Sequence, residues 1–226
     1  MMNRRLAALP AVLALLVGVA GYLATARGEE PAAKPGPALD KLKSGQTADL
    51  FDGKTLAGWK TSDFAGHGPI KVEDRKIMIE TGSELTGITW TGGLPHVDYE
   101  ITLEAMRVDG HDFFCGLTFP VGESPCSLIV GGWGGSTVGL SSIDGLDASE
   151  NETGSYHSFK ENQWYTIRLR VTGKEIKAWI DKEQVVDLDY SDRKISIRFE
   201  VDPSKPLGIA TWCTAAAVRN IRLKKL

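Results

Sequence analysis

Apolar and polar side chains alternate along much of the chain after residue 48. The clearest run is 99–107. Its apolar positions are Tyr99, Ile101, Leu103 and Ala105, and its alternate positions are Glu100, Thr102, Glu104 and Met106. Because successive side chains of a strand point to opposite faces, this run predicts a strand with one face in a core.

Similar patterns follow in both directions along the chain. Strands are expected at 70–72, 76–79, 87–90, 113–119, 127–130, 137–140, 165–171, 176–180, 185–188, 207–211 and 218–223. Within 113–119 the pattern places Phe113, Cys115, Leu117 and Phe119 on one face. No segment has a long helical period of apolar residues. Many short strands at even spacing predict an antiparallel β-sandwich.

The N-terminal segment 1–26 has the organisation of an export signal. Arg4 and Arg5 precede an apolar run, Leu6 to Leu23, and a small-residue stretch at 24–26 follows. This order predicts a signal peptide, with a periplasmic, extracellular or cell-envelope destination. An uncleaved signal anchor is the alternative, since the run approaches the roughly 20 residues that span a bilayer; only then would the protein meet a membrane.

Composition and length limit the possible organisation of the chain after this signal. Residues 27–47 are rich in Pro and Ala and are expected to form a linker, and 48–226 has the length of one β domain. Without 1–26 the chain carries 24 basic and 29 acidic residues, a net charge of −5. The basic residues form no long tract, so nucleic acid is not expected as a partner.

The three cysteines leave two interpretations open. Cys115 and Cys126 flank an expected hairpin turn at 120–125 and, placed symmetrically, could face each other as a disulfide. They could equally be small buried apolar residues. With Cys213 the count is odd, so at least one thiol is free. The close Cys or His pairs of a zinc site are absent from the sequence.

Residues 50–59 read LFDGKTLAGW, in which Asp52-Gly53 is a strong turn pair. This stretch resembles the opening motif of the DUF1080 family, the 3-keto-disaccharide hydrolase domain. Segments 98–107, 162–167, 177–187 and 206–223 resemble later motifs of that family in the same order. The resemblance covers about 48–226, and it implies an all-β, concanavalin A-like jelly-roll sandwich of two antiparallel sheets that acts on carbohydrate.

The middle of the chain departs from the family pattern. Many members carry an Asn-Ser-Gly strand followed by a Tyr-Glu-x-Gln strand, whereas this chain reads HDFFCGL at 111–117 and CSLIVGGW at 126–133. The departure indicates a divergent branch with altered or lost activity.

Three residues are candidates for catalysis. Glycoside cleavage uses two carboxylates, whereas cleavage of a 3-keto sugar can begin when one base removes the proton beside the ketone. Glu104 lies on the polar face of the strand that resembles the family's acidic strand, although a solvated outer face is the alternative. His111 lies in a polar turn and could act as the base or as a metal ligand. Asp144 belongs to an acidic segment, 141–152.

Three more residues are candidates for substrate binding. Trp133 stands among four glycines at 131–135, where an exposed indole would stack on a sugar ring; an inward-folded Trp at a bend is the alternative. Arg107 is expected to pair with Glu104 or with a substrate oxygen, and a plain surface ion pair is the alternative. Asp112 is expected to orient His111 and to contact the sugar.

No cofactor is predicted. The alternative is a divalent cation such as Ca²⁺ bound by 141–152, because carboxylate oxygens are the ligands that Ca²⁺ prefers. A solvated surface loop explains the same composition. The export signal and the family resemblance together imply an exported bacterial protein that cleaves glycosides, 3-keto-glycosides included, by hydrolysis or elimination. A non-catalytic carbohydrate-binding module is the first alternative. A structural cell-envelope protein is the second, and it predicts no pocket and a buried Trp133.

Overall fold

A computed structural model describes residues 35–226. The predicted signal segment 1–26 and the start of the predicted linker lie outside the described residues. Across 35–226, no helix is long and apolar enough to cross a membrane.

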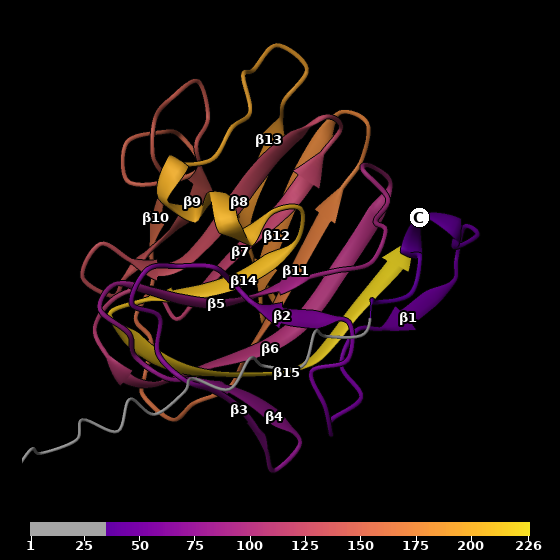
Figure 1. Ribbon diagram of the computed structural model, residues 1–226. Helices are drawn as coiled ribbons and strands as arrows, with labels where there is room; N and C mark the ends of the chain where they lie inside the picture. The colour runs from indigo at the N-terminus through magenta and orange to yellow at the C-terminus, as the bar shows by residue number, and fades with distance from the viewer. Residues whose placement is uncertain (1–34) are drawn as a thin grey trace, which may run out of the picture. The chain divides into compact units, whose positions relative to one another are not determined.

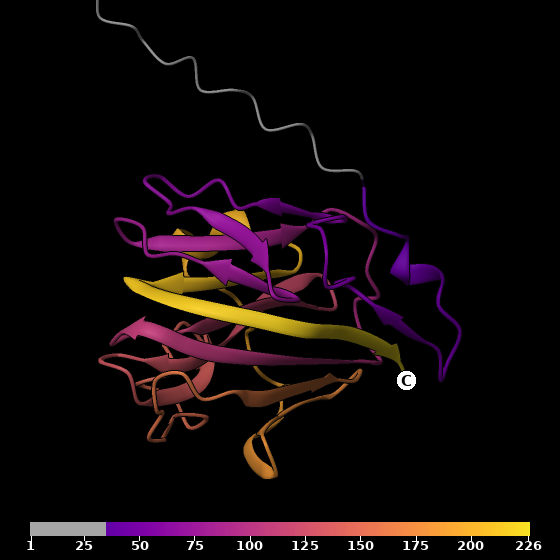
Figure 2. The same ribbon diagram turned by 90° about the horizontal axis from the view of Figure 1, so that it is seen from below.

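The described chain forms two antiparallel β-sheets (Figure 1). The first runs in the order β13-β12-β11-β6-β15-β4-β3, and β1 also pairs with β15. Its strands are β1 (Thr47–Asp49), β3 (Ile70–Glu73), β4 (Lys76–Ile79), β6 (Tyr99–Gly110), β11 (Tyr165–Val171), β12 (Glu175–Ile180), β13 (Glu183–Asp189) and β15 (Thr214–Lys225). The long central pair β6 and β15 is seen side by side in Figure 2.

The second sheet runs in the order β10-β9-β8-β7-β14-β5-β2. Its strands are β2 (Trp59–Thr61), β5 (Leu85–Trp90), β7 (Cys115–Val121), β8 (Ser124–Gly132), β9 (Thr137–Ser141), β10 (Ser155–Tyr156) and β14 (Gly208–Trp212). Two short 3₁₀ helices, η1 (Leu39–Lys41) and η2 (Phe199–Ser204), complete the described elements. The prediction of an all-β sandwich of two antiparallel sheets is confirmed.

The main core fills the space between the two sheets. Ile101 and Leu103 of β6 are at most 1 % exposed, as are Leu117 and Phe119 of β7. The period-two alternation of both strands therefore turns one side of each sheet inward. This arrangement leaves the opposite side of each sheet facing solvent or loops.

The alternation fails at the start of β7. Phe113 was expected on the face of Cys115 and Leu117, but Phe114 enters the core instead and is fully buried. The strand begins only at Cys115, and the Phe113 amide is held by the carboxylate of Asp112 at 2.7 Å. This local bond turns the backbone before the ladder starts, so Phe113 lies on the outer side.

Cys115 and Cys126 do not face each other. The turn of the β7–β8 hairpin is centred between Val121 and Ser124, so Cys126 pairs with Phe119 and Cys115 with Val130. Both thiols are free and buried, and burial raises the pKa of each to about 12. The interpretation as small buried apolar residues holds. The disulfide interpretation is wrong because positions 115 and 126 are symmetric about 120–121, whereas the turn is centred between 122 and 123.

The chain packs onto the domain before residue 48. Leu39 in η1 is 1 % exposed, and its amide donates a hydrogen bond to the carbonyl oxygen of Gly93 at 2.9 Å. Gly36 lies directly against the indole of Trp90, where a Cβ atom would come within 2.4 Å of the ring. Residues 36–41 are thus part of the packed domain.

A connection between β13 and β14 crosses the outer side of the second sheet. Residues 194–196 pair with 142–144 beyond the end of β9. The chain then forms η2, which contacts β5 and β14, and the Pro203 carbonyl accepts a hydrogen bond from Thr89 Oγ1 at 2.8 Å. We call residues 194–207 the strap.

Candidate functional site

A cleft of about 230 Å³ lies between the strap and the outer side of the second sheet. Strands, loops and strap all contribute to its walls. It is lined by Leu85, Asp112, Phe113, Ser127, Ile129, Trp133, Ser141, Arg198, Glu200, Val201 and Trp212.

The floor of the cleft follows from strand alternation. Leu128 and Val130 of β8 point into the core, so Ser127 and Ile129 point the other way and reach the cleft. Ser141 occupies the matching position on β9, opposite Ser127. The floor therefore has two hydroxyls beside one apolar side chain, and both serines are at most 2 % exposed. The Ser127 hydroxyl already lies 2.9 Å from Thr118 Oγ1.

The strap brings a charged group over this floor. The Arg198 guanidinium binds Glu200, with Nη2 at 2.8 Å from Oε1, and it also contacts the carboxylate of Asp147. Asp147 in turn accepts a hydrogen bond from Ser141 Oγ at 3.0 Å. One arginine thus joins the strap to the loop that follows β9.

These contacts set the charge states on the strap. The hydrogen bond from Arg198 lowers the pKa of Glu200, and partial burial opposes that effect without cancelling it. The hydrogen bond to Glu200 raises the pKa of Arg198 in return. At neutral pH the cleft wall therefore holds an ionised carboxylate beside a guanidinium, and 26 % of the Glu200 side chain is exposed.

Trp133 lies at the cleft with its indole partly open to solvent, 42 % exposed. Its φ is +48°, a left-handed conformation that is unusual for a bulky residue, and Gly131 and Gly134 flank it at +78° and +86°. The glycines permit the tight loop that presents the ring. A buried Trp133 with no pocket, as expected for a structural envelope protein, is contradicted.

Arg107 holds this loop from beneath. It is 6 % exposed, and its Nη2 donates hydrogen bonds to the carbonyl oxygens of Gly135 at 2.9 Å, Asp112 at 3.2 Å and Gly131 at 3.3 Å. Burial lowers the pKa of Arg107. The expected pair with Glu104 is absent, because positions three residues apart in β6 lie on opposite faces of the strand.

Asp112 lies at the cleft beside Trp133. Its Oδ1 accepts the amide of Phe113 at 2.7 Å, and its Oδ2 accepts the amide of Gly134 at 3.2 Å. The carboxylate therefore joins the β6–β7 connection to the Trp133 loop. Of the six predicted site residues, only Asp112 and Trp133 line the cleft.

Glu104 lies on the other side of the sandwich, on the outer face of the first sheet. Its Oε2 accepts a hydrogen bond from Arg219 Nε at 2.7 Å, and its Oε1 accepts one from Asn220 at 2.8 Å. Burial raises the pKa of Glu104, but these hydrogen bonds outweigh burial and hold it below its ordinary value. The guanidinium of Arg219 also stacks on Trp164 at 3.9 Å, so this cluster is a cross-strand surface network.

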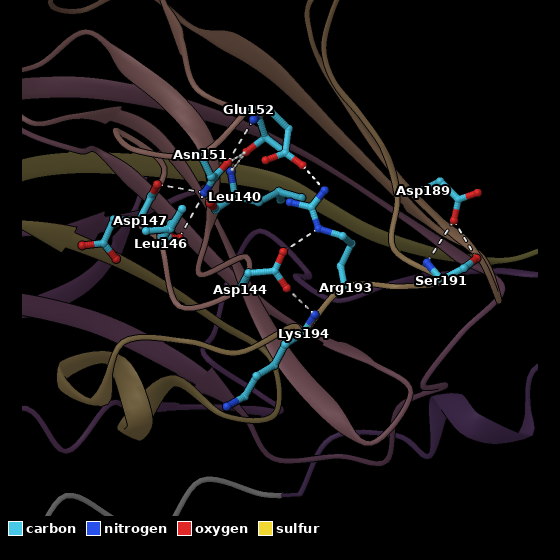
Figure 3. A network of polar contacts seen from close by, with 11 residues as sticks. Leu140, Asp144, Leu146, Asp147, Asn151, Glu152, Asp189, Ser191, Arg193 and Lys194 are labelled. Carbon is cyan, nitrogen blue, oxygen red and sulfur yellow. Dashed lines mark hydrogen bonds and ion pairs between the residues drawn. The ribbon is translucent and has the colours of Figure 1, made fainter.

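Asp144 and His111 do not join Glu104. His111 is exposed on the turn after β6. Asp144 is exposed in the loop after β9, where its Oδ1 accepts the Lys194 amide at 2.7 Å and its Oδ2 accepts Arg193 Nε at 2.6 Å (Figure 3). These bonds, from the Lys194 amide first and Arg193 second, lower the pKa of Asp144. The three predicted catalytic residues are thus on separate surfaces.

The acidic loop at 141–152 faces arginines. Arg193 also binds Glu152, so it joins two carboxylates of the loop to the residue just before the strap (Figure 3). Inside the loop, the Asn151 amide donates to the carbonyl oxygens of Leu140 and Asp147, both at 2.8 Å. Within residues 35–226, no three His, Cys, Asp or Glu side chains are grouped to hold a metal ion.

The sequence patterns missed most of the cleft. Trp212, Arg198, Glu200 and Val201 are not among the predicted site residues. The last three belong to the strap, which has no periodic pattern. The signal in the sequence was indirect: an arginine and a glutamate stand on either side of Phe199. In the structure Phe199 is 84 % exposed. The cleft therefore lies on the outer face of one sheet of a two-sheet antiparallel sandwich, the architecture of a concanavalin A-like jelly roll.

The chain belongs to the family of the 3-keto-alpha-glucoside-1,2-lyase-like domain, whose model matches residues 46–224. The resemblance seen in the sequence is thereby confirmed. A search of curated protein sequences finds no significant match.

Solved structures share the fold at low identity. The Crh5 transglycosylase in complex with NAG is 16 % identical with a TM-score of 0.57, and the match covers 85 % of this chain and 88 % of that one. A candidate glycosyl hydrolase from Parabacteroides distasonis is 14 % identical with a TM-score of 0.51, covering 80 % and 94 %. A protein from work on endo-acting O-glycanases of the human gut microbiota is 12 % identical with a TM-score of 0.52, covering 81 % and 100 %.

Proposed function

We propose that this protein is an exported carbohydrate-active enzyme that binds a glycoside in the cleft and cleaves 3-keto-glycosides. Family membership supports the substrate class. The single observation that carries the proposal is that Trp133, with an exposed indole, shares one cleft with the Arg198–Glu200 pair. The indole of Trp133 suits stacking on a sugar ring, and the Arg198–Glu200 pair suits acid–base chemistry.

The sugar stacks on Trp133. The apolar face of a pyranose matches an indole, and the loop that presents Trp133 is fixed by Arg107 and Asp112. Ser127 and Ser141 supply hydroxyl groups on the floor of the same cleft for the ring hydroxyls.

The reaction is an elimination that uses the strap. The Glu200 carboxylate takes the proton from the carbon between the ketone and the anomeric centre, and the electron pair forms an enolate. The Arg198 guanidinium stabilises the enolate oxygen. The enolate then collapses to a C1=C2 double bond as the glycosidic C–O bond breaks, and the leaving oxygen takes a proton from solvent.

A non-catalytic carbohydrate-binding module is a second candidate, and one observation favours it. The carboxylates at or beside the cleft already have protein partners: Glu200 and Asp147 bind Arg198, and Asp112 accepts two backbone amides. A pKa held low makes Glu200 a weak base, so the same cleft without turnover would serve for recognition alone.

Product release from 3-keto-glucosides and from the unoxidised glucosides tests the proposal. We expect the wild type to cleave the 3-keto compounds, and Glu200→Gln to reduce kcat at least 100-fold, since general-base catalysis contributes about 10²–10⁴ in rate. The matched control is Glu104→Gln, which changes a hydrogen-bonded glutamate on the other face and should stay within twofold. Binding without turnover by the wild type would establish the second candidate, and equal losses in both variants would refute the assignment of Glu200.

A further inference from the structure

The domain has a second apolar cluster that is separate from the core between the sheets. Its buried members are Phe64, Leu85 and Ala210, and Phe113, Val201 and Trp212 pack against them. Four of these six residues, all except Phe64 and Ala210, also line the cleft. We call these four residues the apolar wall.

Two residues of the apolar wall, Leu85 and Trp212, and the two serines of the floor occupy opposite sides of the cleft. Leu85 and Trp212 belong to β5 and β14, whereas Ser127 and Ser141 belong to β8 and β9. In the sheet, β7 separates these two pairs of strands. Arg198 reaches the β9 side through Asp147, while Val201, three residues later, packs with the β5 and β14 side. The β8–β9 side of the cleft therefore carries Ser127, Ser141 and Arg198 with one apolar side chain, Ile129, whereas Leu85, Trp212 and Val201 on the β5–β14 side are all apolar.

We infer that the ligand is a glycoside whose aglycone is a small apolar ring, with the sugar on the polar side and the aglycone on the apolar wall. This inference rests on the proposed function and names its substrate class. A second sugar at the apolar wall would leave its hydroxyls short of partners, and a desolvated hydroxyl without a hydrogen bond costs about 1–3 kcal/mol. An aromatic or alicyclic ring has no such cost there.

The size of the cleft agrees with a compact ligand. Its volume of about 230 Å³ is below the roughly 300–1,000 Å³ common for pockets that enclose drug-sized ligands. One sugar with a short aglycone is a better match to this volume than an oligosaccharide.

Isothermal calorimetry on the full-length protein tests the inference. Four ligands are titrated separately: the methyl, cyclohexyl and phenyl glucosides of one anomer, and a glucose disaccharide. We expect the two ring-bearing glucosides to bind at least tenfold more tightly than the methyl glucoside and the disaccharide, because burying a side-chain-sized apolar group contributes about 1.5–3 kcal/mol. Equal affinities, or tightest binding of the disaccharide, would overturn the inference while the proposed function stands. Failure of all four to bind would also overturn the inference, whereas the proposed function is decided separately by product release from the 3-keto-glucosides.

A pair of isosteric variants locates the effect. Val201→Thr replaces a methyl group of the apolar wall with a hydroxyl, and should reduce the phenyl-to-methyl preference about fourfold. Val185→Thr is the matched control, since Val185 of β13 is also a partly buried valine but packs on the main core. An unchanged preference in Val201→Thr, or the same loss in Val185→Thr, would contradict the placement of the aglycone.

Discussion

Arg107 Nη2 lies 2.9 Å from the carbonyl oxygen of Gly135, and this bond joins the centre of the first sheet to the loop that presents Trp133. The guanidinium stands 5.2 Å from the ring centroid of Phe114, so an aromatic core residue supports the charge. A residue expected to touch the substrate is instead a positioning residue beneath the cleft.

Replacing Arg107 with Met should lower the free energy of unfolding by about 2 kcal/mol, because buried carbonyl groups lose their donor. Glycoside affinity should fall as well, since the Trp133 loop loses its anchor. Urea denaturation with an unchanged m-value measures the first effect. Arg222→Met is the control: Arg222 forms an exposed ion pair with Asp49, and its loss should cost less than about 1 kcal/mol. Equal costs in the two variants would contradict the role given to Arg107.

Trp133→Ala should weaken glycoside binding about tenfold, or about 1.4 kcal/mol, because the stacking surface is removed. Stability should change little, since the ring is 42 % exposed and the residue has a left-handed backbone. Tyr156→Ala removes an aromatic ring that is 78 % exposed and lies outside the cleft lining, so its affinity should match the wild type. An undiminished affinity in Trp133→Ala would argue against the stacking platform.

The contacts of Arg193 make the stability of the 141–152 loop depend on pH. Hydrogen bonds from the Lys194 amide and then from Arg193 lower the pKa of Asp144 from its ordinary 3.8. A hydrogen bond from Arg193 lowers the pKa of Glu152 from its ordinary 4.5. A lowered pKa gives stability that is present above the ordinary pKa and lost as pH falls through the lowered value. Arg193→Ala should therefore shift the urea midpoint downward at pH 7, and the shift should shrink below about pH 4. A shift that grows on acidification would contradict these contacts.

Thiol reactivity should separate the three cysteines. Burial raises the pKa of Cys115 and Cys126 to about 12, whereas Cys213 is only partly buried. A thiol reagent should label one cysteine in the native protein and three after denaturation without reductant. Only one reactive thiol in the denatured protein would show that a disulfide had formed.

The sheets were accessible to sequence reasoning because alternation is a local signal. Tyr99, Ile101 and Leu103 reveal the inward face of β6 without any knowledge of its neighbours. The prediction was wrong at Phe113, where a hydrogen bond between neighbouring residues displaces the start of a strand. The register of the β7–β8 hairpin was also missed, because Cys115 and Cys126 are symmetric about a point two residues before the centre of the turn.

The cleft was much less accessible, because it depends on which strands become neighbours. Asp112 and Trp133 meet Trp212 only because β14 inserts between β7 and β5. Val201 reaches the apolar wall only because the strap crosses the sheet. Glu104 was chosen for its strand and its charge, and alternation alone does not say which sheet face carries a site.

Glycoside titration followed by the indole N–H resonances of the tryptophans tests the location of the site most directly. Single Trp→Phe variants assign the signals. Addition of phenyl glucoside should shift the resonances of Trp133 and Trp212, which line the cleft. Those of Trp164 and Trp179, which stack with arginines on the outer face of the first sheet, should stay in place. Shifts confined to Trp164 and Trp179, or no shift in any indole at saturating glycoside, would contradict a carbohydrate site in the cleft.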